Sequence, residues 1–341
     1  MSTMRERFLR RMRNDNPDWL GDPWECFAWP PGPRGLGPMI GVPQGSLGGD
    51  PPTVGAYYKN FMGVTYFRGA DDPGATPYIT EENKVVKNLE NWRQELSLPS
   101  WSRVTEEDFA SLERSLSQMD RENYLVMGMT APGMFEFSHL VMGFEDSLVS
   151  YLTQPELMNE MLEYYTDWKL EQAKLICDRI RPDVIHSHDD WGSKRALFMH
   201  PDTWRQCIKP HFKRLYGYYK SRGVLIQHHS DCVNHEIAED MVELGIDMWQ
   251  GVIPQNNIKG VVERTGGKLC IMGGIDMQVV DLPNVPEQVI RNEVRRAIDE
   301  YASLGVFIPC IANVRAIYPR THEILCDEMN NYGAEWMSKN N

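Results

Sequence analysis

Residues of three types that can hold a metal stand at the ends of two apolar runs. One run ends in His229, Ser230 and Asp231, and a later run ends in Cys310. Side chains alternate between the two faces of a strand, so we expect His229 and Asp231 to point the same way. If the two runs are neighbouring parallel strands, an imidazole, a carboxylate and a thiolate meet at one sheet edge. Such a set would hold zinc with an open fourth position, which implies catalysis rather than a structural metal.

The same residues also allow an interpretation without metal. Buried free cysteines are common, and a His-Ser-Asp strand end can be a cluster of satisfied hydrogen bonds. Cys310 is also far from His229 in the sequence. Spacing alone therefore leaves both interpretations open, and the elements that carry these residues must decide between them.

Composition narrows the class of protein. A length of 341 residues with 42% hydrophobic residues suits one large α/β barrel or two ordinary domains. A net charge of −13 argues against nucleic-acid binding, which needs clustered Lys and Arg. No run reaches the length of a membrane span, and the N-terminus lacks the apolar core of a secretory signal. Seven scattered cysteines without a Cys-x-x-Cys pair predict reduced thiols and a cytoplasmic location.

From about residue 120, short apolar runs alternate with long amphipathic segments. This order predicts a parallel sheet with helical crossovers. Six strands are expected near residues 124, 184, 224, 246, 269 and 306, and helices over 144–152, 155–180, 201–222, 234–244, 258–265, 286–304 and 319–339. Segments 24–29 and 63–67 are the best candidates for two further strands.

Eight such strands would close a (β/α)8 TIM barrel, which we expect to be a single domain over residues 1–341. Each of the six clear runs ends in polar or small residues, as the active-site face of a barrel requires. Residues 30–105 are rich in Pro and Gly and are expected to form a loop-rich extension over the barrel mouth. A doubly wound open sheet is the main alternative, but no Gly-rich dinucleotide fingerprint follows the first strand.

Four sequence blocks carry a resemblance to a known family. They begin at Thr80 (Thr-Glu-Glu-Asn-Lys-Val-Val-Lys, followed by Trp92), at Asp189 (Asp-Asp-Trp-Gly-Ser, then His-Pro-Asp-Thr-Trp), at Gly223 and at Met272 (Met-Gly-Gly-Ile-Asp). With them the sequence resembles, over nearly its whole length, the uroporphyrinogen decarboxylase superfamily and in particular its corrinoid-linked methyltransferase branch. The resemblance implies a barrel fold and an anaerobic, cytoplasmic enzyme.

Two departures from the family pattern refine the expected activity. True decarboxylases carry an arginine-rich motif after the first strand, whereas residues 24–34 hold one arginine and two tryptophans, too few cations for a polycarboxylate. Thiol methyltransferases of the family use His-x-Cys plus a distant Cys, and here Asp231 stands at the middle position between the matching His229 and Cys310. An oxygen ligand in place of sulfur makes zinc a stronger Lewis acid, which suits a phenolate or alkoxide leaving group.

The resemblance therefore implies an O-demethylase methyltransferase. Methyl from an O-methyl donor, a small methoxylated aromatic, would pass to a Co(I) corrinoid on a separate corrinoid protein, because this chain lacks the Asp-x-His-x-x-Gly cobalamin motif. Zn²⁺ held by His229, Asp231 and Cys310 would activate the ether oxygen. Neither nucleic acid nor a membrane is an expected partner, and a homodimer remains an open alternative.

Further candidates lie at the neighbouring strand end and among the aromatic residues. His188, Asp189 and Asp190 are candidates for the acid or for supporting the metal, although Asp189 could instead cap the next helix. Candidates for the pocket of the aryl ring are Trp24, Phe27, Phe135 and Trp191, which could equally be core residues.

Two other functions stay open. Methyl transfer to a thiol acceptor would require a sulfur-rich zinc site, which Asp231 disfavours. A metal-free decarboxylase or a silent binding subunit would require His229, Asp231 and Cys310 to be hydrogen-bonded to one another.

Overall fold

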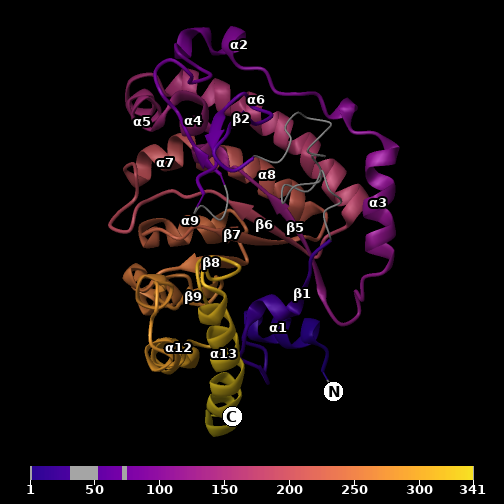
Figure 1. The fold of residues 1–341 in the computed structure, drawn as a ribbon, viewed down its shortest axis with the longest axis vertical. Coiled ribbons are helices and arrows are strands. Elements are labelled where there is room, and N and C mark those ends of the chain that lie inside the picture. Colours follow the sequence, from indigo (N-terminus) through magenta and orange to yellow (C-terminus); the bar gives the residue numbers. More distant parts are fainter. Residues whose placement is uncertain (1, 31–52, 71–74, 341) are drawn as a thin grey trace.

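A curled sheet of seven parallel strands forms the centre of the molecule. The computed structural model describes residues 2–30, 53–70 and 75–340, and Figure 1 shows the strands surrounded by helices. The strands follow one another in chain order as β1, β5, β6, β7, β8, β9 and β10. Their bounds are Phe27–Ala28, Leu125–Thr130, Val184–His188, Leu225–His229, Met248–Val252, Cys270–Gly274 and Phe307–Cys310. The predicted α/β barrel fold and its six clear strands are thus confirmed.

Of the two further strands predicted for the barrel, one is found in part and the other belongs to a different sheet. The predicted strand at 24–29 is confirmed in part, because Phe27–Ala28 pairs with β5 as β1 and residues Pro23–Cys26 form a 3-10 turn (η1). The predicted strand at 63–67 was wrong for the barrel. It forms β3 (Thr65–Phe67), which lies between β2 (Tyr57–Lys59) and β4 (Thr76–Pro77) in an antiparallel sheet. Among the described residues no pairing joins β1 to β10, and η1 contacts β10 at this seam.

Strand periodicity sorts side chains between the barrel interior and the helical layer. Along β7, Gln227 and His229 alternate with Ile226 and His228. Ile226 packs in the outer core under the helices, whereas Leu225, on the face of Gln227 and His229, packs in an inner cluster of Met, Cys and Phe side chains. The barrel interior is therefore apolar near the amino ends of the strands and polar near their carboxyl ends.

Helix α1 (Met4–Arg13) closes the amino ends of the strands. Thr3 and Glu6 form a capping box at its start, and Phe8 and Met12 enter the inner cluster. The buried Arg11 donates to the carbonyl oxygens of Phe307 and Ala302, each at 2.8 Å. With this end closed, the carboxyl ends of the strands form the accessible mouth.

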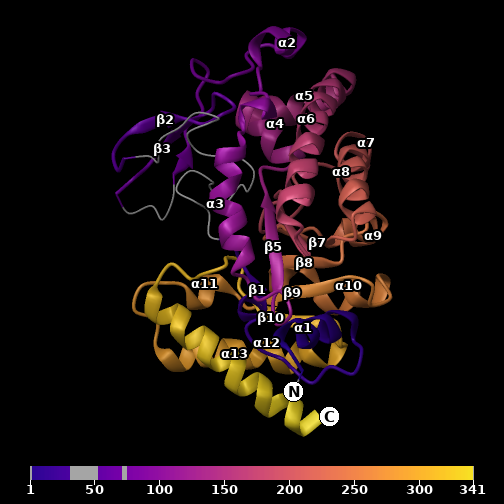
Figure 2. The same ribbon diagram turned by 90° about the vertical axis from the view of Figure 1, so that its right-hand side faces the viewer.

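The remaining helices cover the outside of the sheet. They are α3 (Glu106–Ser117), α4 (Met134–Met142), α5 (Phe144–Thr153), α6 (Pro155–Leu175), α7 (Pro201–Cys207), α8 (Lys209–Ser221), α9 (Ala238–Glu243), α10 (Ile258–Arg264), α11 (Met277–Val280), α12 (Glu287–Tyr301) and α13 (Pro319–Asn340). A short helix, α2 (Trp92–Glu95), belongs to the segment before β5. Figure 2 shows α7, α8 and α9 on one side of the strands and the small antiparallel sheet on the other. Within the described residues, no helix combines the length and the apolar character needed to cross a membrane.

The loop-rich segment is built only partly from regular elements. Residues 31–52, which include Arg34, and residues 71–74 lie outside the described residues. The described part includes the small sheet, whose Tyr66 and Pro77 line a cavity together with residues at the carboxyl ends of β5 and β6. This part of the extension therefore lies at the barrel mouth, as expected.

Candidate active site

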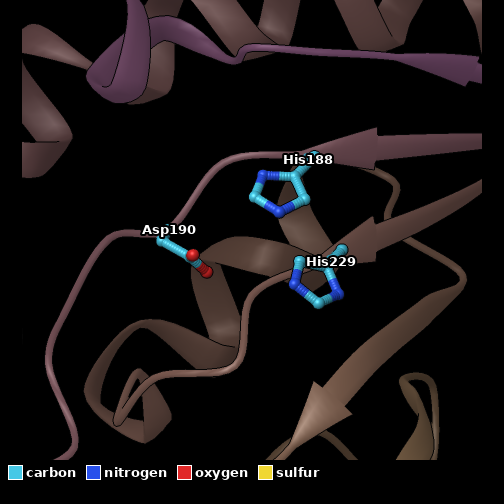
Figure 3. Close-up of side chains that lie close together, drawn as sticks. All are labelled: His188, Asp190 and His229. Atoms are coloured by element: carbon cyan, nitrogen blue, oxygen red, sulfur yellow. The ribbon is translucent and has the colours of Figure 1, made fainter. Parts of the chain in front are cut away.

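The register of three neighbouring strands places polar side chains side by side at the mouth. His188 is the partner of His229 between β6 and β7, and His229 is the partner of Gln250 between β7 and β8. The rings of His188 and His229 are stacked with centroids 4.4 Å apart. Asp190 follows the end of β6, and Figure 3 shows its carboxylate directed toward the two imidazoles. Ligand atoms of His188, Asp190 and His229 all lie within 4.8 Å of one another.

Each imidazole of this group has a fixed orientation. The Nδ1 atom of His188 lies 2.9 Å from a carboxylate oxygen of Glu136, and Nδ1 of His229 lies 2.5 Å from the amide oxygen of Gln250. An acceptor at Nδ1 makes this nitrogen the donor and leaves Nε2 available as a ligand. Metal-binding histidines in proteins are usually oriented in this way by a carboxylate or carbonyl oxygen. The two imidazoles and the carboxylate of Asp190 therefore fit a catalytic zinc site with an open position.

Glu136 was missed by sequence reasoning. It lies in the first turn of α4, the helix that follows β5, and its carboxylate points to His188. Burial acts to raise the pKa of Glu136, but the attraction of His188 outweighs it and leaves the pKa below its usual range. Burial also lowers the pKa of His188, but the same carboxylate outweighs this effect and raises the pKa to about 9. A cation at Nε2 would have to displace the proton of His188, because a ligand imidazole is neutral.

The two other candidates at this strand end have different roles. Burial raises the pKa of Asp190, one of whose oxygens accepts from the backbone N–H of Asp231 at 3.1 Å. Asp189 is fully buried and accepts from the backbone N–H groups of Phe135 and Glu136 and from the indole of Trp191. Asp189 therefore caps α4, which precedes it in the chain, and holds Glu136 in place. Its predicted role as an acid is not supported by these contacts.

The predicted metal set of His229, Asp231 and Cys310 needs correction. The ligand atoms of these three residues do not form one group. In the sheet, β8 and β9 lie between the strand of His229 and the strand of Cys310. Gln250 stands between them, with its oxygen at His229 and its amide nitrogen 3.6 Å from the Cys310 sulfur. Burial raises the pKa of the Cys310 thiol, which donates to the carbonyl of Ile311.

Asp231 and Cys232 belong to a second group. Their ligand atoms lie within 4.8 Å of one another and of Asp190. Strand alternation would turn Cys232 away from Asp231, but β7 ends at His229, so the rule does not extend to this turn. Burial raises the pKa of the Cys232 thiol, and the carboxylates of Asp190 and Asp231 raise it further.

The predicted aromatic pocket is not assembled as expected. Phe135 and Trp191 are fully buried under the helices, where Phe135 stacks on Phe198 and Trp191 stacks on His228. Phe27 packs against Phe8 in the inner cluster. Trp24 alone stays close to the site, with its ring centroid 6.2 Å from that of His186 inside the barrel. Phe135 and Trp191 are core residues because they lie on the helical side of the sheet.

A cavity of about 350 Å³ opens beside His188, and we call it the β5–β6 cavity. Its walls come from the ends of β5 and β6, from α4 and from the small sheet. The lining residues are Tyr66, Pro77, Met129, Ala131, Pro132, Glu136, His139, Leu140 and His188. A larger cavity of about 550 Å³ lies beside Asp183 and Val224, at the amino ends of β6 and β7. In barrels of this type the carboxyl ends of the strands carry the chemistry, so the β5–β6 cavity is the candidate substrate site.

Comparisons with known proteins establish the fold. No protein-family model matches the sequence, and no curated protein matches it. The structure is similar to that of a methyltransferase from Methanosarcina mazei, with a TM-score of 0.62 and 16% identity, over 97% of this chain and 99% of that chain. A dihydropteroate synthase from Xanthomonas albilineans with 4-aminobenzoic acid gives a TM-score of 0.31 and 12% identity, over 53% of this chain and 57% of that chain. The second similarity is too weak to indicate a shared fold. The first shows that the chain has the barrel fold of that methyltransferase over almost its whole length.

Proposed function

We propose that this protein is a methyltransferase that moves a methyl group from an aryl methyl ether to the Co(I) corrinoid of a separate protein. The observation that carries the proposal is the group of His188, Asp190 and His229 beside the β5–β6 cavity. The position of this group at the carboxyl ends of the strands and the family resemblance of the sequence support it.

We propose that Zn²⁺ is held by His188, Asp190 and His229 instead of by the set predicted from the sequence. Zinc bound there would act as a Lewis acid on the oxygen of the donor. Glu136 and Gln250 would orient the two imidazoles through Nδ1. Asp231 and Cys232 lie close to Asp190, so a second carboxylate and a thiol stand beside the proposed ligands.

The chain's own residues would bind and orient the donor. The β5–β6 cavity would hold the aryl ring with its methoxy group toward His188. In the reaction the C–O bond breaks and its electron pair stays on oxygen, which takes a proton from solvent and leaves as a phenol. The Co(I) corrinoid of the partner protein would act as the nucleophile and would supply both electrons of the bond to the methyl carbon. The mouth must admit the partner's corrinoid, because attack on carbon requires bonding distance.

Methyl transfer to a thiol acceptor is the less suitable alternative. It would need a sulfur-rich group to hold the acceptor as a thiolate. Among the described residues, the group of the two imidazoles contains no sulfur, and the neighbouring group contains only that of Cys232. The donor set therefore favours an oxygen leaving group.

The direct test is methyl transfer to cobalamin reduced to Co(I), with zinc-replete protein under anaerobic conditions. Methoxybenzene should give methylcobalamin and phenol in equal amounts, and His229→Ala should lose this activity. His200→Asn is a matched control, because His200 is exposed at the start of α7 and asparagine keeps its capping ability. Absence of transfer from any methoxyarene, to free or protein-bound corrinoid, would contradict the proposed function.

A further inference from the structure

Four aliphatic side chains are exposed on the two segments that follow β9 and β10. Val279 and Leu282 belong to the segment between β9 and α12, and Val314 and Ile317 belong to the segment between β10 and α13. The side chains of Leu282 and Ile317 are 48% and 55% exposed. We call these four residues the rim patch. Because both segments begin at the carboxyl ends of strands, the rim patch lies at the barrel mouth.

One buried carboxylate holds the two segments together. Asp281 accepts from the backbone N–H of Ile317 at 2.8 Å and from that of Tyr318 at 3.3 Å. Asp281 lies between Val279 and Leu282 in the chain, so this contact brings the two halves of the rim patch side by side. The rim patch is therefore one apolar surface with a fixed backbone, which is a property of interaction sites.

The rim patch lies on a different side of the mouth from the β5–β6 cavity. In the sheet, β7 and β8 stand between β6 and β9, and β1 follows beyond β5 at the other edge. Met277 and Ala312, from the two segments of the patch, line a small cavity together with Asp231. The ligand atoms of Asp231 and Asp190 lie within 4.8 Å of each other. A protein seated on the rim patch would therefore border the metal group without covering the β5–β6 cavity.

Three exposed cations stand around the rim patch and the small cavity, although the net charge of the chain is −13. Arg315 lies between the two patch residues of its segment, and Lys194 and Arg195 lie on the loop after β6, where Lys194 lines the small cavity. Among the described residues none of these three cations forms a salt bridge. Two neighbouring acids are already bonded, because Asp281 accepts from backbone N–H groups and Asp276 caps α11. Free cations around an apolar centre suit a partner surface with an apolar centre and an acidic rim.

Resting on the proposed function, we infer that the rim patch is the docking surface for the corrinoid-carrying partner protein, and that this partner presents an acidic rim around an apolar centre. A second copy of this chain is less suitable, because a two-fold pairing centred on the patch would bring Arg315 toward its own copy and cover the mouth. A lipid surface is less suitable, because neither segment contains the Trp or Phe that anchors proteins at a membrane interface.

Equilibrium binding tests the inference without turnover. Corrinoid proteins purified from the source organism by their cobalt content are titrated one at a time into the full chain by calorimetry. One of them should bind, and Ile317→Asp and Arg315→Glu should each weaken its binding by about tenfold or more. The affinity for the wild type should also fall as salt is added, because salt screens exposed charges.

Two matched controls change the same kinds of side chain elsewhere. Val149 is an exposed aliphatic residue of α5, and Lys268 is exposed just before the amino end of β9. Val149→Asp and Lys268→Glu should leave the dissociation constant unchanged. Circular dichroism checks the folding of each variant, and Ile317→Ser replaces Ile317→Asp if the aspartate variant is not folded.

The outcomes distinguish the inference from the proposed function. The inference is overturned if no corrinoid protein binds the wild type, or if one binds the patch variants as tightly as the wild type, even where methyl transfer to free cobalamin is observed. It is also overturned if light scattering shows a dimer that Ile317→Asp dissociates, or if vesicles of phosphatidylglycerol bind the wild type and not Arg315→Glu. Docking with the predicted pattern, but without methyl transfer from any methoxyarene, supports the inference and contradicts the proposed function.

Discussion

At the scale of single residues, the site depends on hydrogen bonds that fix side chains from behind. The amide oxygen of Gln250 accepts a hydrogen bond from His229, and its amide nitrogen donates to the carbonyl groups of Ile311 and Ala312. Glu136 reaches His188 from a helix that is itself held by Asp189. Because these contacts occupy the Nδ1 atoms, the Nε2 atoms of the two imidazoles are left to bind a metal together with the carboxylate of Asp190.

Asp189 is predicted to be a positioning residue with a measurable effect on stability. Asp189→Asn replaces one acceptor oxygen by a donor opposite the N–H groups of α4, which should lower the free energy of unfolding by about 2 kcal/mol. Urea denaturation measures this loss. An Asn variant of unchanged stability that had lost all activity would instead assign Asp189 to the reaction.

Lys169 is predicted to make stability depend on pH. Burial lowers its pKa to about 7, from an ordinary 10.5. Between these values the unfolded chain holds a proton that the folded chain releases, so the cost of Lys169 is largest below about pH 7 and diminishes toward pH 10. Lys169→Met should therefore stabilise the protein by roughly 2 kcal/mol at pH 7 and by less at pH 9.5.

Urea denaturation at the two pH values measures the effect of Lys169. Lys174→Met is the matched control, because Lys174 is exposed on the same helix and should give no such change. An equal gain in unfolding free energy for Lys169→Met at both pH values would contradict the prediction that burial lowers the pKa of Lys169.

At the scale of elements, strand order explains why some site residues were predictable and others were not. The apolar runs that end in His188 and His229 identified two strand ends correctly, whereas the strand that carries Gln250 continues to Val252. The assumption that the runs of His229 and Cys310 are neighbours failed, because β8 and β9 lie between them in the sheet. Glu136 carries no signal in the sequence beyond its place after a strand, since its role depends on how Asp189 fixes α4.

The small sheet was the least predictable element. Residues Thr65–Phe67 have the alternating pattern of a strand, but their side chains are only half-buried. So short a run does not distinguish a barrel strand from an antiparallel strand at the mouth. The two differ in burial, because a parallel barrel strand is covered on both faces and β3 is not. The short β1 was predictable only as a region, since most of the predicted run forms a 3-10 turn.

The closure of the barrel by α1 is predicted to be a major source of stability. Phe8 is fully buried, with its ring 4.8 Å from that of Phe27. Phe8→Ala should lower the free energy of unfolding by about 3–5 kcal/mol because it leaves a cavity in the interior. Phe144→Ala, at an exposed position of α5, should cost much less. A small loss for Phe8→Ala in thermal denaturation would contradict the role of α1 as a closing element.

At the scale of the whole molecule, chemistry and closure occupy opposite ends of the barrel. Both termini lie at the lower end in Figures 1 and 2, where α1 and α13 are found. The carboxyl ends of the strands carry the candidate metal group and the cavity. A partner that delivers a corrinoid would therefore approach the end remote from the termini, where the small sheet forms one wall of the cavity.

Metal content measured by plasma mass spectrometry on anaerobically purified protein tests the central claim most directly. The proposed donor set predicts near-stoichiometric zinc in the wild type and in Cys310→Ala, and loss of zinc in His188→Ala and Asp190→Ala. Circular dichroism controls for folding of each variant. A metal-free wild type, or zinc that is lost in Cys310→Ala and retained in His188→Ala, would contradict the assignment of His188, Asp190 and His229 as the metal ligands.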